Sequence, residues 1–384
     1  MSYRLGQGTG PLQGVKVVEL AGIGPGPHAC MLLADLGADV LRVDRPGGGH
    51  LGGGAHDILT RGRPSVALDL KNPDAVRTVL DLVEQADVLV EGMRPGAAER
   101  LGLGPEVCHA RNPRLVYGRM TGWGQEGPLA HSAGHDMNYI SVAGALFGLG
   151  QDPGRPHFPQ NLLGDFGGGS TYLVIGILAA LLEARVSGEG QVVDAAIVDG
   201  TAHLNAMGAA FAAAGMPVDR RTSGLLDGGV PYYDVYETAD GRHVSVAPLE
   251  GQFYAEFAKL LELPDDAPDR NDLEKLDELR GLITARFRER TQAEWVELFE
   301  GSDACVAGII PLTEAFEHPH NKARGTFVEL DGITQPAPAP RFSRTSPTLT
   351  SGPSVAGGQT RVALEAWGVP DVEDLLASGA ATQA

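Results

Sequence analysis

Two polar patches hold the side chains best suited to chemistry. The first is Gly134-His135-Asp136-Met137-Asn138-Tyr139, and the second runs from Asn161 to Ser170 and contains Asp165. The first patch begins with a glycine and the second is rich in glycine, and each precedes an apolar helical run. The first backbone N–H groups of a helix have no partner within that helix. An imidazole, two carboxyl groups and free N–H groups would serve proton transfer and the stabilisation of an oxyanion.

Each of these residues also has a purely structural explanation. Asp165 would make an ordinary helix cap, and His135 would make an ordinary loop histidine. For either residue alone, the structural and the catalytic explanations are about equally good. The two residues together favour the catalytic explanation.

A second set of residues is suited to binding an anion. Arg45 follows the second expected strand and Arg94 follows the fourth, and ligands of a doubly wound sheet bind beyond the carboxyl ends of its strands. The same half of the sequence also contains Arg61, Arg63, Lys71 and Arg100. The set suits a ligand with several phosphates, although a solvated surface is the better explanation for any single arginine.

The elements that must position these groups follow a β-α-β pattern. Expected strands in the first 120 residues are Val15–Leu20, Asp39–Asp44, Ser65–Leu70, Asp87–Val90 and Arg114–Met120. Helical stretches separate them, and Asn72-Pro73-Asp74 has the cap, first-turn proline and first-turn acid of a helix start. The pattern predicts a large, doubly wound, Rossmann-like α/β domain with a parallel sheet.

The pattern changes after residue 225. Asp240-Gly241 lies between two strand-like runs and indicates a hairpin, and Thr291 to Glu294 is a capping box before a helix. These signals predict a smaller α+β domain. We expect residues 1–200 to form the large domain, 201–225 a linker, 226–320 the small domain, and 321–384 a return linker and the C-terminal part of the large domain.

Composition narrows the function. The chain has 384 residues, 43% of them hydrophobic, and a formal net charge of −19, which excludes disorder and disfavours nucleic acid and anionic membranes as partners. The longest apolar run, Tyr172–Leu182, is too short to span a bilayer. Three widely separated cysteines indicate a reducing compartment, so we expect a cytoplasmic protein.

Several common cofactor motifs are missing from the sequence. Gly22-Ile23-Gly24-Pro25-Gly26-Pro27 has proline where the dinucleotide fingerprint ends in glycine, and no P-loop, HExxH helix or GxSxG elbow occurs. His318-Pro319-His320 has no third ligand nearby in the sequence and is expected to be a surface turn. We therefore expect neither a nicotinamide site nor a metal site.

Several motifs resemble family III of the coenzyme A transferases, a superfamily that also contains racemases. The motifs are Val18 to Pro27, Leu36 to Val40, Glu91 to Gly96, Met120 to Gly124 and Gly164 to Gly169. Three others resemble the α-methylacyl-CoA racemase branch: Gly134-His135-Asp136, Leu226-Asp227-Gly228-Gly229 and Ala247-Pro248-Leu249-Glu250. The resemblance covers residues 12 to about 345. Ala202 to Met216 is poorer in methionine and richer in alanine than the acyl-binding region of that branch, which leaves the acyl preference open.

The resemblance implies a large domain that holds coenzyme A and a homodimer of interlocked subunits with shared active sites. It implies that His135 and Asp165 are the acid/base groups, that Glu250 partners His135 across the dimer, and that Asp136 supplies a backbone N–H to the thioester oxygen. Further residues expected to contact coenzyme A are Arg45, Leu68, Gly92, Met93, Arg94, Arg100, Gly134, Asn138, Tyr139 and Asn161. Coenzyme A enters as part of an acyl-CoA substrate, so no separate cofactor is expected.

The implied activity is inversion of carbon 2 of a 2-methylacyl-CoA thioester through an enolate, a step in branched fatty acid metabolism. It needs one base on each face of carbon 2. Unperturbed Asp and His titrate near ~3.9 and ~6.5, so the pKa of Asp165 must rise before the group delivers a proton near neutrality. Burial beside Phe166 would raise that pKa and a helix N-terminus would lower it, and the sequence leaves both possible.

Two other functions fit the same residues. A coenzyme A transferase would use Asp165 as a nucleophile and would not need His135. A coenzyme-binding or scaffold protein could share the fold without catalysis, but the combination of His135, Asp165 and Glu250 argues against it.

Overall fold

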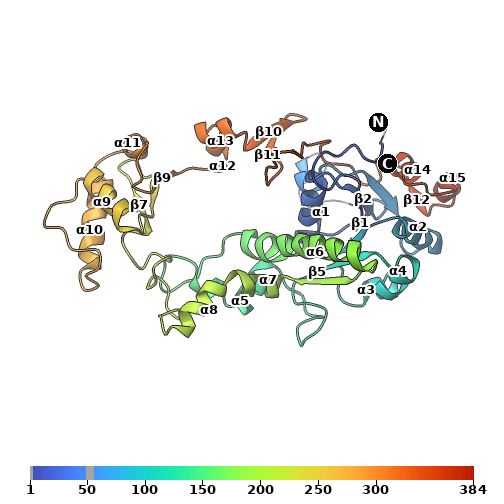
Figure 1. The fold of residues 1–384 in the computed structure, drawn as a ribbon, viewed down its shortest axis with the longest axis horizontal. Coiled ribbons are helices and arrows are strands. Elements are labelled where there is room, and N and C mark those ends of the chain that lie inside the picture. Colours follow the sequence, from blue (N-terminus) through green and yellow to red (C-terminus); the bar gives the residue numbers. More distant parts are fainter. Residues whose placement is uncertain (1–2, 49–55) are drawn as a thin grey trace. The chain divides into compact units, whose positions relative to one another are not determined.

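The computed structural model describes residues 3–48 and 56–384 and divides the chain into two compact units (Figure 1). Unit 1 consists of Met1–Ala143, Pro159–Leu204 and Pro319–Ala384, and unit 2 consists of Gly144–Phe158 and Asn205–His318. Residues 144–158 belong to unit 2, although their sequence position suggested the large domain. Of the residues expected to form a linker, 201–225, the first four belong to unit 1 and residues 205–225 belong to unit 2.

The described residues of unit 1 form a seven-stranded sheet in the order β12-β3-β2-β1-β4-β5-β6. The strands are β1 (Lys16–Leu20), β2 (Asp39–Asp44), β3 (Ser65–Leu68), β4 (Val88–Glu91), β5 (Val116–Thr121), β6 (Val192–Ala196) and β12 (Ala381–Thr382). The expected α/β class is confirmed. The sheet is mixed rather than parallel, because β12 runs antiparallel to β3, and a two-residue edge strand is too short to leave a sequence pattern.

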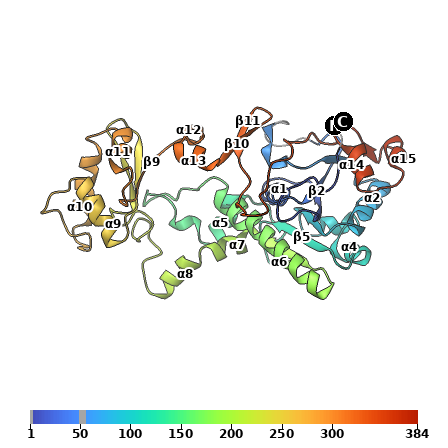
Figure 2. The same ribbon diagram turned by 45° about the horizontal axis from the view of Figure 1, so that its top comes forward.

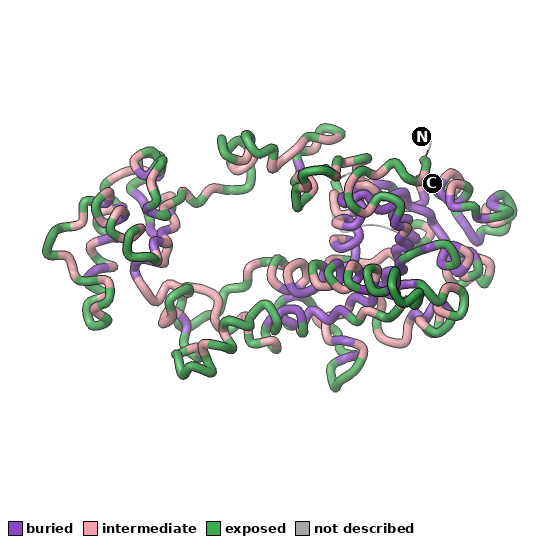
Figure 3. Tube along the Cα trace, in the orientation of Figure 1, coloured by how far each residue is buried: buried purple, intermediate pink, exposed green. Residues whose placement is uncertain are grey.

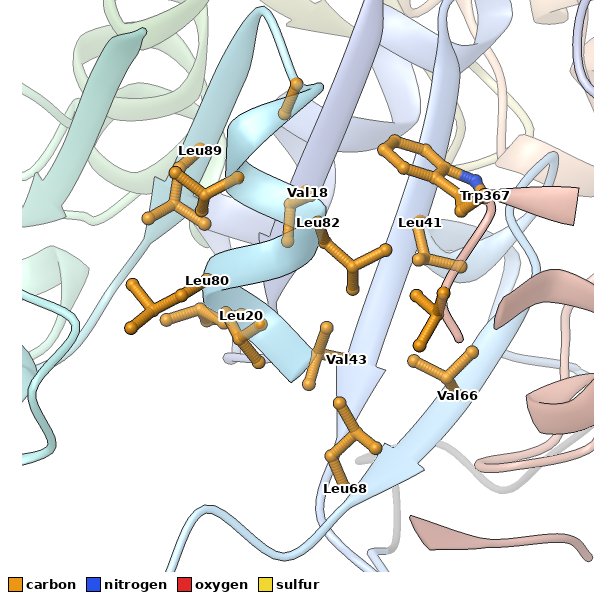
Figure 4. Close-up of a cluster of buried hydrophobic side chains, with 14 of the residues drawn as sticks. Val18, Leu20, Leu41, Val43, Val66, Leu68, Leu80, Leu82, Leu89 and Trp367 are labelled. Atoms are coloured by element: carbon orange, nitrogen blue, oxygen red, sulfur yellow. The ribbon is translucent and has the colours of Figure 1, made fainter. Parts of the chain in front are cut away.

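Strand residues alternate between the two faces of this sheet. Val18 and Leu89 enter one core, which also contains α2 (Pro73–Glu84), whereas Val17 and Val88 enter a second core on the other face, with α1 (Pro25–Asp35) and α6 (Thr171–Ser187). Figure 4 shows the first core, where Trp367 packs with leucines and valines of the strands. Strands β2, β3 and β4 are buried along their whole length (Figure 3), as expected of strands covered on both faces.

Short elements complete unit 1. They are α3 (Ala97–Arg100), α4 (Pro105–Arg111), α5 (Asp136–Val142), a π-helix η4 (Leu162–Ser170), α7 (Ile197–Leu204), α13 (Pro319–Arg324), α14 (Thr360–Ala366), α15 (Val372–Ala377), the 3-10 helix η2 (Ile58–Thr60) and a hairpin of β10 (Phe327–Leu330) and β11 (Ile333–Pro336). The C-terminal α14 contacts β3, which is far away in sequence. Figure 2 shows α14, in red, beside the blue N-terminal part of the chain.

Unit 2 contains a three-stranded antiparallel sheet of β7 (Asp234–Glu237), β8 (His243–Val246) and β9 (Val306–Ile309). The expected Asp240-Gly241 turn joins β7 to β8, and the Thr291–Glu294 capping box starts α11. Its helices are α8 (Ala206–Ala213), α9 (Gly251–Leu260), α10 (Leu276–Phe287), α11 (Gln292–Phe299), α12 (Leu312–Ala315) and the 3-10 helix η3 (Leu146–Gly148). An aromatic core that includes Phe257, Phe287 and Trp295 holds the sheet against α9, α10 and α11.

One continuous helical stretch, Leu162–Ser187, has 26 residues and a mean hydropathy of 1.5, enough in length and composition to cross a membrane. The apolar run expected from the sequence, Tyr172–Leu182, is shorter because it leaves out the residues of this stretch on either side. Leu173 and Ile177 of this stretch pack against Gly118 of β5, as in a helix that covers a sheet. The cytoplasmic location stays a prediction.

Candidate active site

The strand order reverses between β1 and β4, and the loops at their carboxyl ends form a cavity of about 340 Å³. We call it the His135 cavity. It is lined by the turn after β1 (Gly22 to Pro27), the turn after β4 (Gly92 to Pro95), the end of β5 (Thr121 to Trp123), Gly134, His135, Tyr139 and Asp165. The two residues proposed for acid/base chemistry, 30 positions apart in the sequence, therefore line one cavity at the expected end of the sheet.

His135 is the N-cap residue of α5 and has an extended backbone. Its N–H donates to the Asn138 side-chain oxygen at 3.0 Å, so Asn138 organises the start of the helix. Asp136 is the first residue of α5, and an N–H at that position has no acceptor within the helix. The structure thus provides the helix-start N–H that the sequence predicted next to the imidazole.

The side chain of Asp136 turns away from solvent and is 6% exposed. Its Oδ2 accepts a hydrogen bond from the backbone N–H of Asp165 at 2.7 Å. The two polar patches are thereby connected through a buried carboxylate. The sequence predicted a role only for the backbone of Asp136, because no local pattern indicates this contact of its side chain.

Asp165 lies within the π-helix η4 rather than before a helix start. Its N–H is not free for an oxyanion, because it donates to Asp136. Burial and, second, the nearby charge of Asp136 raise the pKa of Asp165 to about 6, although a hydrogen bond from Asn161 and the charge of His135 act in the opposite direction. The competition left open by the sequence is therefore decided in favour of a raised pKa.

The glycines of η4 allow close packing rather than anion binding. A Cβ at Gly168 would overlap Thr201 of α7, and one at Gly200 of α7 would overlap the Gly168 carbonyl. On the other side, Gly24 has φ +72° and a Cβ there would lie 3.3 Å from Asp165 Oδ2. The backbone of η4 lies close to α7 on one side, and the backbone at Gly24 lies close to Asp165 on the other. These close approaches place Asp165 at the cavity.

A larger cavity of about 720 Å³ adjoins the first, and we call it the Arg45 cavity. The two share part of the turn after β1, Met93 and Asp165. Of the residues expected to contact coenzyme A, Arg45, Leu68, Met93 and Asn161 line the Arg45 cavity, whereas Gly92, Met93, Arg94, Gly134 and Tyr139 line the His135 cavity. Arg45 and Arg94 are exposed, and Lys71 also lines the Arg45 cavity. Each of the two cavities therefore has at least one cationic side chain in its lining.

Arg100 and Asn138 line neither cavity. Arg100 ends α3 and is exposed. Glu250 belongs to unit 2, where it is the exposed N-cap residue of α9. The backbone just before Glu250 is held by Arg270, which donates to the carbonyl oxygens of Pro248 (3.2 Å) and Leu249 (2.8 Å).

The suggestion that Arg61 and Arg63 could hold phosphates is wrong. Arg61 is 2% exposed and pairs with Asp35 at 2.6 Å, and Arg63 is 0% exposed and pairs with Glu19 at 2.8 Å. Both guanidinium groups are therefore engaged within the protein. Sequence position alone does not distinguish a buried arginine from a surface arginine.

Side-chain contacts that no local sequence pattern indicates hold the turn after β4. Glu91 is buried, accepts the N–H of Met93 at 2.6 Å and pairs with Arg119 of β5 at 2.9 Å. Tyr139 donates its hydroxyl proton to the Gly134 carbonyl, and a Cβ at Gly122 would overlap its ring. These contacts fix the loops that carry Arg94 and His135.

Comparisons with known proteins agree on a family. The family described as CoA-transferase family III matches residues 12–360. The chain is 41% identical over 369 residues to the alpha-methylacyl-CoA racemase of Mus musculus, covering 95% of each chain, and 30% identical to the succinyl-CoA:glutarate CoA-transferase of Mus musculus, covering 97% of this chain and 91% of that protein. The crystal structure of a CAIB/BAIF family protein from Brucella suis superposes with a TM-score of 0.81 at 26% identity, covering 94% of this chain and all of that one.

Proposed function

This chain belongs to CoA-transferase family III, and from that premise we propose that it is a racemase that inverts carbon 2 of 2-methylacyl-CoA thioesters. The observation that carries the proposal is that an imidazole and a carboxyl group with a pKa raised to about 6 line the same cavity. Its higher identity to a relative named as a racemase than to one named as a transferase agrees with this choice.

In the proposed reaction, one base removes the proton of carbon 2 and the electron pair of that C–H bond enters an enolate. An acid on the opposite face then returns a proton to the same carbon. In one direction neutral His135 is the base and protonated Asp165 is the acid, and in the other direction the roles reverse. With a pKa of about 6, roughly a tenth of Asp165 is protonated at pH 7, so both protonation states are available.

Acid/base catalysis of this kind contributes about 10²- to 10⁴-fold, which is not sufficient for an enzyme of ordinary efficiency. The negative charge on the thioester oxygen must also be stabilised. We assign this to the N–H of Asp136 at the start of α5, because one well-aimed N–H donor to an oxyanion is worth about 3 to 4 kcal/mol.

The coenzyme A part of the substrate fits the Arg45 cavity. Its phosphates are anionic, and Arg45 and Lys71 line this cavity while Arg94 lines the adjoining one. Exposed cations of this kind attract phosphates even though the whole chain carries a net charge of −19. Met93 and Asp165 border both cavities, which suits a substrate whose thioester lies where they meet.

We further propose a homodimer. On α6, Ile175, Leu182 and Val186 are 55%, 63% and 89% exposed, and α8 has no buried residue although its sequence is AMGAAFAA. Apolar helix faces of this extent favour burial against another chain. In this dimer, Glu250 of one subunit pairs with His135 of the other and orients its imidazole.

A coenzyme A transferase is the second candidate. It is favoured by the position of Asp165 at the border of both cavities, where its carboxylate would attack a thioester carbonyl. The leaving thiolate of coenzyme A would then attack the resulting anhydride and form an aspartyl thioester. The presence of His135 in the cavity argues for the racemase, because this sequence of steps has no need of it.

The deciding experiment is incubation of the full chain with 2-methylacyl-CoA in D₂O. The racemase predicts deuterium at carbon 2 and interconversion of the two enantiomers. His135→Ala and Asp165→Ala should each abolish the interconversion, and each should abolish exchange from the enantiomer whose hydrogen faces the missing base. Exchange that is absent from the wild-type protein would overturn the racemase. The transferase predicts an aspartyl thioester that hydroxylamine traps, and transfer of coenzyme A to a free acid.

A further inference from the structure

His28 of α1 contacts the π-helix that carries Asp165, and no role has been assigned to it above. We propose that His28 is a positioning residue for Asp165: its ring and its Nδ1–H hold the turn of η4 from Phe166 to Ser170 in the register that directs Asp165 into the His135 cavity. The inference rests on the proposed racemase function, because it concerns one of the two bases of that reaction.

The first contact is a stack. The rings of His28 and Phe166 lie 4.1 Å apart between centroids with an interplanar angle of 18°. Phe166 directly follows Asp165, so the stack fixes the residue next to the carboxyl group. The N-terminus of α1 also approaches Asp165 itself, since Gly24 caps this helix and a Cβ there would lie 3.3 Å from Asp165 Oδ2.

The second contact is a hydrogen bond whose direction follows from the neighbouring bonds. Ser170 Oγ donates its only proton to the Phe166 carbonyl oxygen at 3.0 Å. When it does so, it accepts the bond from His28 Nδ1, which lies 2.6 Å away, and the ring proton of His28 is on Nδ1. We assign this tautomer to His28, so that Ser170 links its ring to the backbone of Phe166, the residue after Asp165.

The carbonyl oxygen of Phe166 is where the π-helix register is set. It accepts the N–H of Thr171, five residues on, and the Thr171 hydroxyl at 2.8 Å as well as the Ser170 hydroxyl. A π-helical turn is rare and is often found at functional sites. The hydrogen bond through Ser170 and the ring stack both contact this turn, and they stabilise its π-helical register. An ordinary α-helical register would rotate Asp165 away from the His135 cavity.

The surroundings keep His28 neutral. Burial, together with the charges of Arg61 and Arg63, lowers the pKa of His28 to about 4. Those two guanidinium groups are held by Asp35 and Glu19 respectively. His28 therefore remains uncharged across the pH range in which Asp165 titrates, as a fixed support requires.

The test measures deuterium incorporation from D₂O at carbon 2, separately for the two enantiomers of 2-methylacyl-CoA. The enantiomer whose hydrogen faces Asp165 is identified as the one whose exchange is lost in Asp165→Asn. His28→Phe keeps an aromatic ring for the stack but removes the N–H. We expect it to slow exchange from that enantiomer about tenfold, the loss of one oriented hydrogen bond, and to change exchange from the other less than twofold.

Three further variants make the result specific. Ser170→Ala removes the acceptor while the His28 ring stays, and it should reproduce the asymmetry if His28→Phe does not fold. His28→Asn places an N–H near the position of Nδ1 and should recover exchange relative to His28→Phe. His109→Phe is the matched control, because His109 is half-buried, hydrogen-bonded to the Leu115 carbonyl and outside both cavities; both enantiomers should exchange at the wild-type rate.

Equal slowing of both enantiomers in His28→Phe and Ser170→Ala, or no slowing at all, would overturn the positioning role while leaving the racemase in place. A wild-type protein that exchanges neither enantiomer would overturn the proposed function and this inference with it. The two failures are therefore distinguishable in one set of measurements.

Discussion

The Asp136 carboxylate accepts the backbone N–H of Asp165 across 29 residues of sequence, at 2.7 Å. This bond joins the start of α5, which carries His135, to the π-helix η4. The same carboxylate contributes to the raised pKa of Asp165. One buried side chain thus influences both the relative placement of the two candidate bases and the proton affinity of one of them.

The charge of Asp136 should therefore be visible in the pH dependence of racemisation. Asp136→Asn retains a side-chain oxygen that accepts the Asp165 N–H but removes the negative charge, so the pKa of Asp165 should fall from about 6 toward its ordinary value. We expect the limb of the kcat profile that reports Asp165 to move to lower pH, and kcat at pH 7 to decrease severalfold in the direction that needs protonated Asp165. A profile unchanged in position would show that Asp136 does not tune this group.

Asp165 should also make stability depend on pH. Its folded pKa, about 6, lies above the ordinary value, so protonation favours the folded state and this contribution is lost as pH rises from about 4 to 6. Asp165→Asn, which is permanently neutral, should then be more stable than wild type at pH 8, by roughly 1 kcal/mol after allowance for solvent screening. Thermal unfolding at pH 8 and at pH 4 measures this, and the difference should vanish at pH 4.

The buried pair of Arg63 and Glu19 should be needed for folding rather than for substrate binding. Both side chains are at most 1% exposed and lie 2.8 Å apart, so Arg63→Met leaves a buried carboxylate without its partner and should cost about 3 to 5 kcal/mol. Urea unfolding measures the loss, and the double variant Arg63→Met with Glu19→Met should recover much of it. Arg111→Ala, at an exposed pair with Glu84, should cost less than about 1 kcal/mol.

Arg45 should contribute to binding of coenzyme A and not to the proton transfers. It is exposed at the rim of the Arg45 cavity, so Arg45→Ala should raise KM about fivefold to tenfold, as expected for loss of a charge-assisted contact, with kcat within twofold of wild type. The wild-type KM should also rise with salt. Arg77→Ala is the control, because Arg77 is exposed on α2 and lines neither cavity. An equal rise in KM for Arg77→Ala would attribute the effect to overall charge.

Local sequence signals predicted most elements of the fold. Val18, Leu41 and Leu89 belong to apolar runs short enough to be strands, and five of the expected strands lie within two residues of the observed ones at each end. The caps at Asn72 and Thr291 are also observed, since Asn72 accepts the N–H of Asp74 at 2.9 Å and Thr291 accepts that of Glu294 at 3.3 Å. Such signals survive because capping and apolar periodicity act over a few residues.

The sequence by itself determined which chemistry was available: an imidazole at position 135, a carboxyl group at position 165 and a helix start beside the first. Only the tertiary structure decided that these groups line one cavity, that burial and the charge of Asp136 raise the pKa of Asp165, and that Arg61 and Arg63 form buried ion pairs with carboxylates. The physical reason is that burial, electrostatic coupling and close packing depend on residues distant in sequence, as Gly168 and Thr201 or His28 and Ser170 illustrate. No local pattern records such pairs before the chain has folded.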